Sequence, residues 1–359
     1  MSEYQVAFIG TGPEPETPVW GQSAAMAYRH AEGYDRQPAC RLTACADIVA
    51  ENARAFAERN GIDDGSVFTE YERMLEATSP DVVSVCTPVP THADIVVACA
   101  EHEEGPSAIH CEKPMAVTMA DSRRMTAACD REGVQLTFNH QRRVSAPSRR
   151  LVSLAAGGAV GDVERIELTT KNLFDSGTHF IDLCNAVLED RPAEWVLGAI
   201  DYRVENVRYG VHNDNEAFVR WRYEGGVDAV AAMGDDADFI DCDLRVLGTD
   251  GAVELNPPGD TQLRCKRGET EPWEEIHTGE PFSDIPAAID DVIEGLETGA
   301  EPELSARRAL AAMEIILAGY ESSRRRGRVD LPLEIDDNPL VALVESGELT
   351  PQPQSQDRE

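Results

Sequence analysis

Lysine is scarce in this chain: of its 359 residues, only Lys113, Lys171 and Lys266 carry an ammonium side chain. Lysine and arginine together number 32 against 66 acidic residues, which gives a formal net charge of -34. That charge repels the phosphates of nucleic acids and the surfaces of anionic membranes, so neither is an expected partner. An acid excess spread over the whole chain is typical of proteins in a salty cytoplasm, where screening shortens the repulsion. We therefore expect the protein to lose stability in dilute buffer.

The cysteines lack the spacing of a metal or disulfide framework. There are nine, an odd number, and none forms a C-x-x-C pair, so we expect neither a metal site nor disulfides. No apolar segment approaches the roughly 18 residues that a membrane span needs. The chain also begins with a strand-like run instead of a charged and apolar leader. These absences predict a cytoplasmic protein without a membrane anchor.

The first part of the chain alternates between short apolar runs and helix-like segments. The runs, which are typical of buried strands, are Val6–Ile9, Leu42–Ala46, Asp81–Pro88 and Ser107–His110. The helix-like segments include Ser23–His30, Asn52–Ala57 and Ala93–Ala100. Such an alternation implies a parallel sheet with helices on both faces.

Glycines follow the first of these strands, and an acid follows the second. The backbone amides of Gly10-Thr11-Gly12 can hold a pyrophosphate at the start of a helix. The Asp47 carboxylate can accept hydrogen bonds from both hydroxyls of an adenosine ribose and would repel a 2′-phosphate, and Ile48 supplies no cation. These features predict a Rossmann domain that binds NAD in preference to NADP; an ordinary turn followed by a helix-capping aspartate is the alternative. An enlarged loop, Pro13–Trp20, replaces the usual third glycine, so we expect Gly21 to take its packing role.

Two further segments carry candidates for proton transfer. Cys111-Glu112-Lys113-Pro114 follows an apolar strand, and a chain that uses arginine almost everywhere else has kept an ammonium there. Asp175–Cys184 has turn character and passes into an apolar helix, with His179 and Asp182 three residues apart on one face. Imidazole can exchange a proton near neutral pH, and a nearby ammonium favours a developing alkoxide. The plainer alternatives are a surface lysine, a core histidine bonded to Asp182 and a helix-capping Asp175.

The second half of the chain has a different pattern. Helices are expected at Ser148–Ala156, Ile285–Leu296 and Ala306–Arg324. Period-two alternation suggests a mainly antiparallel sheet with one helix-covered face, built from Val163–Thr169, Ala217–Tyr223, Asp228–Ala232, Asp243–Leu247 and Ala252–Leu255. The end of the chain is polar and contains proline, and we expect poor order there. The predicted organisation is an NAD-binding domain over residues 1–144, a substrate-binding and oligomerisation domain over residues 145–335 and an acidic tail over residues 336–359.

An ordered set of short motifs runs through nearly the whole chain. In sequence order these are Gly10-Thr11-Gly12, Ala46-Asp47, Thr87-Pro88 with His92, Glu112-Lys113-Pro114, Asp175 with His179, Gly248-Thr249-Asp250-Gly251 and Tyr320-Glu321-Ser322. The set resembles the glucose-fructose oxidoreductase/inositol dehydrogenase (Gfo/Idh/MocA) family. This resemblance implies an α/β fold, with an N-terminal Rossmann parallel sheet and a C-terminal α+β domain whose open, mainly antiparallel sheet often packs face to face in homodimers or homotetramers.

The resemblance also implies the reaction. It implies hydride transfer between C4 of a nicotinamide and a carbinol carbon of a sugar, cyclitol or sugar derivative. Lys113 would lie against the reacting hydroxyl, and His179 would be the general acid/base. Asp175 would be the charge partner of His179 or a substrate contact. Lys113 as the base is the competing version.

Weaker assignments follow from the same resemblance. The residues implied at the cofactor are Gly10, Thr11, Gly12, Asp47, Thr87 and Pro88, with His92 and Glu112 close by. Arg142 and Arg143 could contact cofactor or substrate, but we expect at least one of them to form a surface or inter-domain ion pair, and Arg143 is left out of the candidate site. Only a short segment separates Arg165 from Asp175, which predicts a more open pocket than in many relatives.

Two other functions fit the same sequence. An NAD-dependent glycosidase would oxidise a sugar transiently, eliminate the aglycone and restore the cofactor. A non-catalytic sensor would bind a dinucleotide or a sugar and signal to a partner protein. The presence of Lys113, Asp175 and His179 together argues against the sensor, because a sensor need not keep proton-transfer groups.

Overall fold

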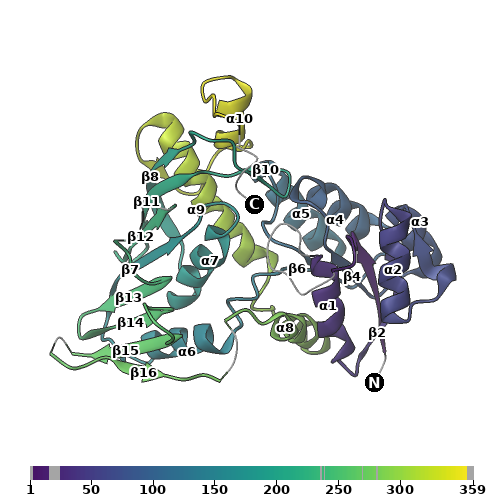
Figure 1. Ribbon diagram of the computed structural model, residues 1–359, viewed down its shortest axis with the longest axis horizontal. Coiled ribbons are helices and arrows are strands. Elements are labelled where there is room, and N and C mark those ends of the chain that lie inside the picture. The colour runs from purple at the N-terminus through teal and green to yellow at the C-terminus, as the bar shows by residue number, and fades with distance from the viewer. Residues whose placement is uncertain are drawn as a thin grey trace. The chain divides into compact units, whose positions relative to one another are not determined.

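The structure, a computed structural model, describes residues 3–15, 25–234, 237, 239–268, 270–279 and 282–353 (Figure 1). Most of the enlarged loop after Pro13, and Gly21 with it, lies outside these residues. The chain divides into two compact units: Met1–Gln141 with Asp284–Ala309, and Arg142–Ser283 with Leu310–Glu359. Among the described helices, none combines the length and the apolar character that crossing a membrane requires.

The first unit is built on a six-stranded sheet. Its strand order is β3-β2-β1-β4-β5-β6, and every neighbouring pair is parallel. The strands are β1 (Tyr4–Ile9), β2 (Cys40–Ala46), β3 (Val67–Phe68), β4 (Val82–Val85), β5 (Ala108–Cys111) and β6 (Gln135–Phe138). The helices of the unit are α1 (Met26–Asp35), α2 (Ala50–Asn60), α3 (Tyr71–Thr78), α4 (His92–Glu101), α5 (Met119–Glu132) and α8 (Ile285–Thr298). The predicted Rossmann sheet is confirmed, and the order reverses between β1 and β4, where such sheets bind their ligands.

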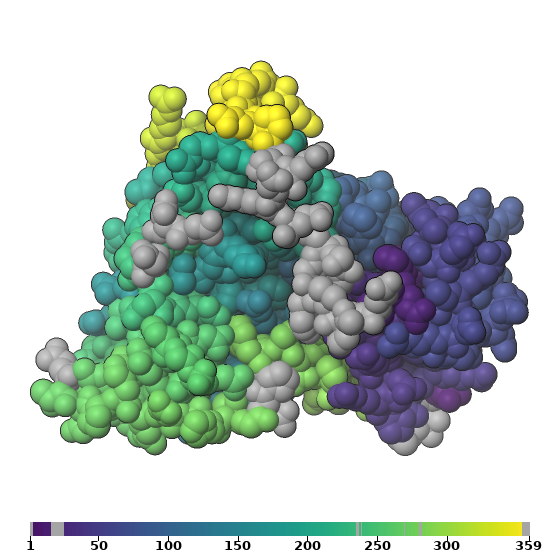
Figure 2. All heavy atoms as spheres, viewed as in Figure 1, coloured from purple at the N-terminus to yellow at the C-terminus, as the bar shows by residue number. Residues whose placement is uncertain are grey.

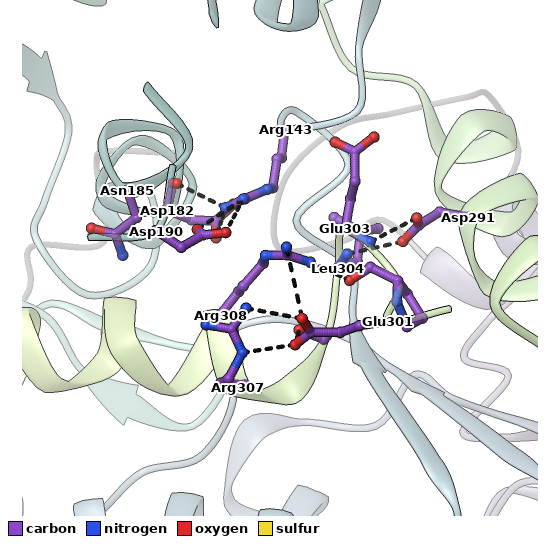
Figure 3. Close-up of polar contacts among 12 residues, drawn as sticks. Arg143, Asp182, Asn185, Asp190, Asp291, Glu301, Glu303, Leu304, Arg307 and Arg308 are labelled. Carbon is purple, nitrogen blue, oxygen red and sulfur yellow. Dashed lines mark hydrogen bonds and ion pairs between the residues drawn. The ribbon is translucent and has the colours of Figure 1, made fainter. Parts of the chain in front are cut away.

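Helix α8 belongs to the first unit, although it was expected within the domain of residues 145–335. Its buried residues Ile285, Ile289, Val292 and Ile293 join the same hydrophobic cluster as Phe8 and Tyr34. A Cβ on Gly33 of α1 would lie 2.7 Å from Ile289, so the two helices meet at a glycine (Figure 1). The Asp291 carboxylate accepts hydrogen bonds from the backbone of Glu303 and Leu304, which fixes the chain after α8 (Figure 3). The position of α8 is therefore set by burial of its apolar residues against segments that are distant in the sequence.

The second unit is built on a nine-stranded sheet of order β16-β15-β14-β13-β7-β12-β11-β8-β17. Most pairs are antiparallel, as expected, but β12 and β7 pair in parallel. The strands are β7 (Val163–Thr170), β8 (Ala193–Asp201), β11 (Glu216–Tyr223), β12 (Asp228–Met233), β13 (Leu244–Gly248), β14 (Gly251–Leu255), β15 (Leu263–Arg267), β16 (Glu274–Ile276) and β17 (Val329–Asp330). A separate pair is formed by β9 (Val207–Arg208) and β10 (Val211–His212).

One face of this larger sheet is covered by helices. The helices near it are α6 (Ala146–Ala156), α7 (Gly177–Val187) and α9 (Ala306–Arg325). Gly319 of α9 approaches β8 and β11 closely enough that a Cβ would lie 3.3 Å from Val219. Residues of β11 alternate between buried and exposed, and Phe218 on the opposite face is 52% exposed. The prediction of an open sheet with one covered face is confirmed.

Poor order was expected after residue 336, but the described residues of this segment, 337–353, include a helix. Pro339–Glu345 forms α10, whose N-cap Asn338 accepts hydrogen bonds from the backbone of Leu340 and Val341. In the space-filling view this helix stands out on the second unit (Figure 2). The backbone N–H of Gln352 donates to the carbonyl of Arg203. The side-chain cap and the buried Leu340 supply order that the polar composition did not reveal.

Candidate functional site

The glycine turn after β1 has the backbone that only glycine adopts easily. Gly10 and Gly12 have φ of +82° and +64°. A Cβ on Gly10 would lie 2.5 Å from Cγ2 of Thr87 and 2.9 Å from its backbone nitrogen. Any side chain at position 10 would therefore collide with the end of β4. The turn and Thr87 lie side by side at the point where the strand order reverses.

Asp47 lies at the end of β2, where it braces this turn. Its Oδ2 atom accepts hydrogen bonds from the Gly12 N–H at 2.8 Å and the Thr11 hydroxyl at 3.2 Å. Its Oδ1 atom accepts from the Val49 N–H at 2.9 Å. The carboxylate is 8% exposed, whereas the next side chain, Ile48, is 92% exposed. The structure thus brings together the four residues predicted at the phosphate and ribose end of a dinucleotide.

His92 joins two turns at the carboxyl edge of the sheet. The ring is wholly buried, with Nε2 2.8 Å from the Thr87 carbonyl oxygen and Nδ1 3.1 Å from that of Pro114. Burial lowers the pKa of His92, although the backbone carbonyls oppose this effect. Both ring nitrogens face protein carbonyls, so the ring holds the turns that carry Thr87 and Lys113. Direct contact of His92 with a cofactor stays a prediction, as it does for the exposed Pro88.

The Glu112 carboxylate points into the unit. Its Oε1 atom accepts from His30 Nε2 at 2.9 Å and from the Asn139 amide at 2.7 Å, and its Oε2 atom accepts from the Lys113 backbone N–H at 3.2 Å. Burial alone would raise the pKa of Glu112, but the hydrogen bond and charge of His30 outweigh it and lower the pKa to about 2. Lys113 itself is only partly buried. Glu112 therefore contacts protein groups on both oxygens, and its proximity to the cofactor stays a prediction.

In the second unit, the loop between β7 and α7 carries Asp175. The side-chain oxygens of Asn172 and Asn213 accept hydrogen bonds from the Asp175 N–H at 2.9 and 3.0 Å. The Asp214 carboxylate accepts from the Leu173 N–H at 3.0 Å. The Asp175 carboxylate lies 4.0 Å from the Arg208 guanidinium. Three buried side chains thus hold the backbone of this loop, in which Asp175 is itself 7% exposed.

His179 lies in the first turns of α7 and is 4% exposed. The same helix is anchored through Asp182, which accepts from Arg143 at 3.0 Å, while Asp190 accepts from Arg143 through both carboxylate oxygens (Figure 3). Arg143 is 6% exposed. Arg143 therefore forms buried ion pairs with two acids of its own unit, and is not the surface or inter-domain pair that was expected of at least one of Arg142 and Arg143.

Arg142 is held by aromatic rings. Its guanidinium carbon lies 4.9 Å from the centre of the Phe180 ring and 5.0 Å from that of Phe282. Burial lowers the pKa of Arg142, and the Asp243 and Asp175 carboxylates oppose the shift. Phe180, which follows His179 in α7, is thus one of the two aromatic side chains that position this arginine.

One cluster of potential metal ligands occurs in the described residues. Asp241, Cys242 and Glu254 place a ligand atom each within 4.8 Å of one another. However, the Arg245 guanidinium donates hydrogen bonds to both Asp241 and Glu254. A cation already neutralises these carboxylates, so the residues do not fit a metal ion.

Several residues around the site were missed from sequence. They are His30, Ser84 and Asn139 in the first unit, and Asn172, Asn213 and Asp214 as a buried support in the second. A usable signal existed in the first unit, because β4, β5 and β6 each carry polar residues two positions apart at their carboxyl ends. Strand alternation alone explains such a pattern equally well, so only the structure shows that these side chains face one another.

Comparisons with known proteins give the same two-part picture. A family model described as "Oxidoreductase family, NAD-binding Rossmann fold" matches residues 5–140, and one described as "Oxidoreductase family, C-terminal alpha/beta domain" matches residues 167–331. The chain is 25% identical to D-apiose dehydrogenase of Paraburkholderia graminis, over 97% of this chain and 95% of that one. It is 27% identical to 1,5-anhydro-D-fructose reductase of Ensifer adhaerens, over 70% and 81% of the two chains.

Solved structures show the same fold. An aldose-aldose oxidoreductase from Caulobacter crescentus, crystallised with glycerol, has a TM-score of 0.74 and 22% identity over 92% of this chain and 100% of that one. A dehydrogenase from Bordetella pertussis, crystallised with NADH and UDP-GlcNAcA, has a TM-score of 0.73 and 19% identity over 92% and 100%.

Proposed function

Because the chain belongs to the glucose-fructose oxidoreductase/inositol dehydrogenase (Gfo/Idh/MocA) family of oxidoreductases, we propose that it oxidises or reduces a carbinol carbon of a sugar, cyclitol or sugar derivative with Lys113 and His179 handling the hydroxyl proton. Its family and its relatives make it an NAD-dependent dehydrogenase acting on CH–OH groups. The observation that carries the proposal is Lys113 itself, one of three lysines, fixed by its backbone N–H at the carboxyl end of β5.

The turn after β1 fits the adenosine half of NAD. Gly10 and Gly12 keep side chains out of the turn, and Asp47 offers a carboxylate where the ribose hydroxyls would lie. To bind them, Asp47 would share the oxygen atoms that now brace the turn. The exposed Ile48 provides apolar surface beside the acid and no charge for a 2′-phosphate. These features favour NAD over NADP, and Thr87 and Pro88 would line the nicotinamide end.

NAD, when bound, supplies a nicotinamide C4 that accepts or returns a hydride. As the hydride leaves the carbinol carbon, the hydroxyl proton must pass to a base, and we assign that base to the His179 imidazole. The Lys113 ammonium would favour the developing alkoxide. Asp175 would stabilise charge on His179 or contact the substrate. Lys113 and His179 lie in different units, so the proposal requires both to reach one substrate in the reacting complex.

We propose that a second copy of the chain covers the open face of the nine-stranded sheet. Leu197 and Phe218, on neighbouring strands of that face, are 47% and 52% exposed. Large apolar side chains of this kind are usually covered in an assembly. Light scattering in salt should give a dimer or tetramer, and Phe218→Glu should shift it toward the monomer.

The first test is NADH absorbance in salt of about 2 M, where acidic repulsion is screened. The panel contains D-apiose, myo-inositol, other sugars, sugar acids and glycosides. Wild-type enzyme should form NADH with at least one compound, whereas Lys113→Ala should not. Lys266→Ala, which removes a partly buried lysine of β15, is the matched control and should keep full activity.

Other outcomes of this test separate the alternatives. Full turnover by Lys113→Ala would overturn the assigned role of that lysine. Glycoside cleavage without net NADH would identify the transient-oxidation glycosidase. Tight NAD binding without turnover of any compound would favour the sensor.

A further inference from the structure

Three neighbouring strands of the first unit carry two rows of polar side chains on one face. Ser84, His110 and Thr137 are aligned across β4, β5 and β6 in register. Two residues further along each strand come Cys86, Glu112 and Asn139. Most of these side chains are fully buried, with exposures of 0% for Ser84, His110, Thr137 and Asn139 and 7% for Glu112. A row of polar groups inside a Rossmann sheet is costly unless they bond one another.

His30 of α1 connects the two rows. Its Nδ1 atom lies 2.7 Å from the Ser84 hydroxyl oxygen, and its Nε2 atom lies 2.9 Å from Glu112 Oε1. The ring is 0% exposed and lies 4.9 Å from the ring of His110. Burial alone would lower the pKa of His30, but Cys86 and the Glu112 carboxylate raise it above the usual value. His30 and Glu112 therefore form a buried ion pair.

The carboxylate of this ion pair also contacts the backbone of Lys113. Glu112 Oε1 takes hydrogen bonds from His30 and Asn139, and Oε2 takes one from the Lys113 N–H. One carboxylate thus links α1, β6 and the turn after β5. A buried ion pair seldom adds net stability over an apolar replacement of similar size, so stability alone does not account for it.

We propose that His30 is a positioning residue for Lys113: by bonding Glu112 and balancing its charge, it fixes the backbone from which the lysine side chain reaches its substrate. Without the imidazole, Glu112 would keep its hydrogen bond from the Lys113 N–H but lose its charged partner. An unbalanced carboxylate would then compete for the nearby ammonium. This inference rests on the proposed function of Lys113, and its test is chosen to separate the two.

His110 offers a matched comparison. It is equally buried, lies on the same sheet face and hydrogen-bonds the Thr137 hydroxyl at 2.9 Å. His30→Phe and His110→Phe each replace a buried imidazole by an apolar ring. His30→Gln places an amide near the former Nε2 position, where it can still donate to Glu112. A general loss of packing would affect the two phenylalanine variants alike, whereas positioning of Lys113 should depend on position 30.

The measurement is competitive acetylation of the folded protein by acetic anhydride, read by mass spectrometry. With only three lysines in the chain, Lys171 and Lys266 act as internal standards for Lys113. We expect His30→Phe to change the rate at Lys113, relative to both standards, by about threefold or more, because a neighbouring charge has been left unbalanced. His30→Gln should lie closer to wild type, and His110→Phe should match wild type. Equal Lys113 rates in wild type, His30→Phe and His30→Gln would overturn the inference.

Turnover with the best compound of the panel gives a second reading. His30→Phe should lower kcat by about tenfold or more with little change in the dissociation constant of NAD, because misplacing a reacting group costs rate more than binding. Loss of turnover in Lys113→Ala with unchanged kcat in His30→Phe would reject the positioning role and keep the proposed function. Full turnover in Lys113→Ala would reject the proposed function, while the acetylation rates would still decide whether His30 positions Lys113.

Discussion

The Tyr320 hydroxyl donates a 2.6 Å hydrogen bond to Oδ1 of Asp214, and both side chains are wholly buried in the second unit. The same carboxylate accepts from the Leu173 N–H, two residues before Asp175. Burial raises the pKa of Asp214 to about 6, although the Tyr320 hydrogen bond acts in the opposite direction. Asp214, which supports the loop that carries Asp175, therefore has a pKa within the pH range in which many enzymes are assayed.

The sign of its contribution to stability follows from this shift. The folded protein binds the Asp214 proton more tightly than the unfolded chain does, so protonation of Asp214 stabilises the folded state. This stabilisation is present at low pH and is lost as the pH rises through about 6. Asp214→Asn, which resembles the protonated acid, removes this dependence. We expect the melting temperature of wild type minus that of Asp214→Asn to fall between about pH 4 and about pH 7. A difference that stays constant over this range would contradict the prediction, and Tyr320→Phe controls for loss of the hydrogen bond alone.

Asp47 and Ile48 should together decide the cofactor. A carboxylate at position 47 repels a 2′-phosphate, and the exposed side chain at position 48 has room for a cation. Asp47→Ser combined with Ile48→Arg should weaken NAD binding and strengthen NADP binding, shifting the ratio of the two kcat/KM values by about tenfold or more. Asp47→Ser alone is the control, since it should weaken NAD binding without creating a phosphate site. Unchanged preference in the double variant would place the ribose elsewhere.

Much of the first unit could be predicted because its signals are local. Strand β2 was expected over Leu42–Ala46 and extends over Cys40–Ala46, and Asp47 braces the glycine turn at its end. Helix α5 was missed although Thr118 and Asp121 show a capping pattern, with the Thr118 side chain accepting from the Asp121 N–H. The sequence therefore carries a local signal for this helix as well.

The polar rows could not be predicted in this way. His30 meets Ser84 and Glu112 across 54 and 82 residues of sequence, and no local pattern states that α1 covers those strands. Period-two polar residues such as His110 and Glu112 equally fit a strand with one solvated face. The same limit applies to α8, whose apolar residues could have packed on either sheet. The features that could not be predicted from the sequence are therefore mostly contacts between distant segments, which depend on the topology of the fold.

Salt should stabilise this protein by screening. Acidic residues outnumber basic ones by 66 to 32, so like charges lie close together over much of the surface. We expect the melting temperature to rise steeply from about 0.1 M to about 1 M KCl and to level off by about 2 M, because the screening length is already near 3 Å at about 1 M. Sucrose at matched osmolality is the control, since it strengthens burial without screening. An equal rise in sucrose, or no rise in KCl, would contradict the expectation of a protein adapted to salt.

The Arg143 ion pairs should matter far more than similar pairs on the surface. Arg143 is 6% exposed and bonds Asp182 and Asp190, whose side chains are 1% and 11% exposed, so Arg143→Met would remove the cation between two largely buried carboxylates. Removing one partner of a buried ion pair costs about 3–5 kcal/mol, because the remaining charge is desolvated without compensation. Arg222→Met breaks an ion pair with Asp228 in which the arginine is 37% exposed, and water can replace the lost contact. Denaturant unfolding of the two variants in salt should show a large loss for Arg143→Met and almost none for Arg222→Met. Similar small losses in both would mean that water reaches Asp182, and that α7 with its His179 is held by its apolar face alone.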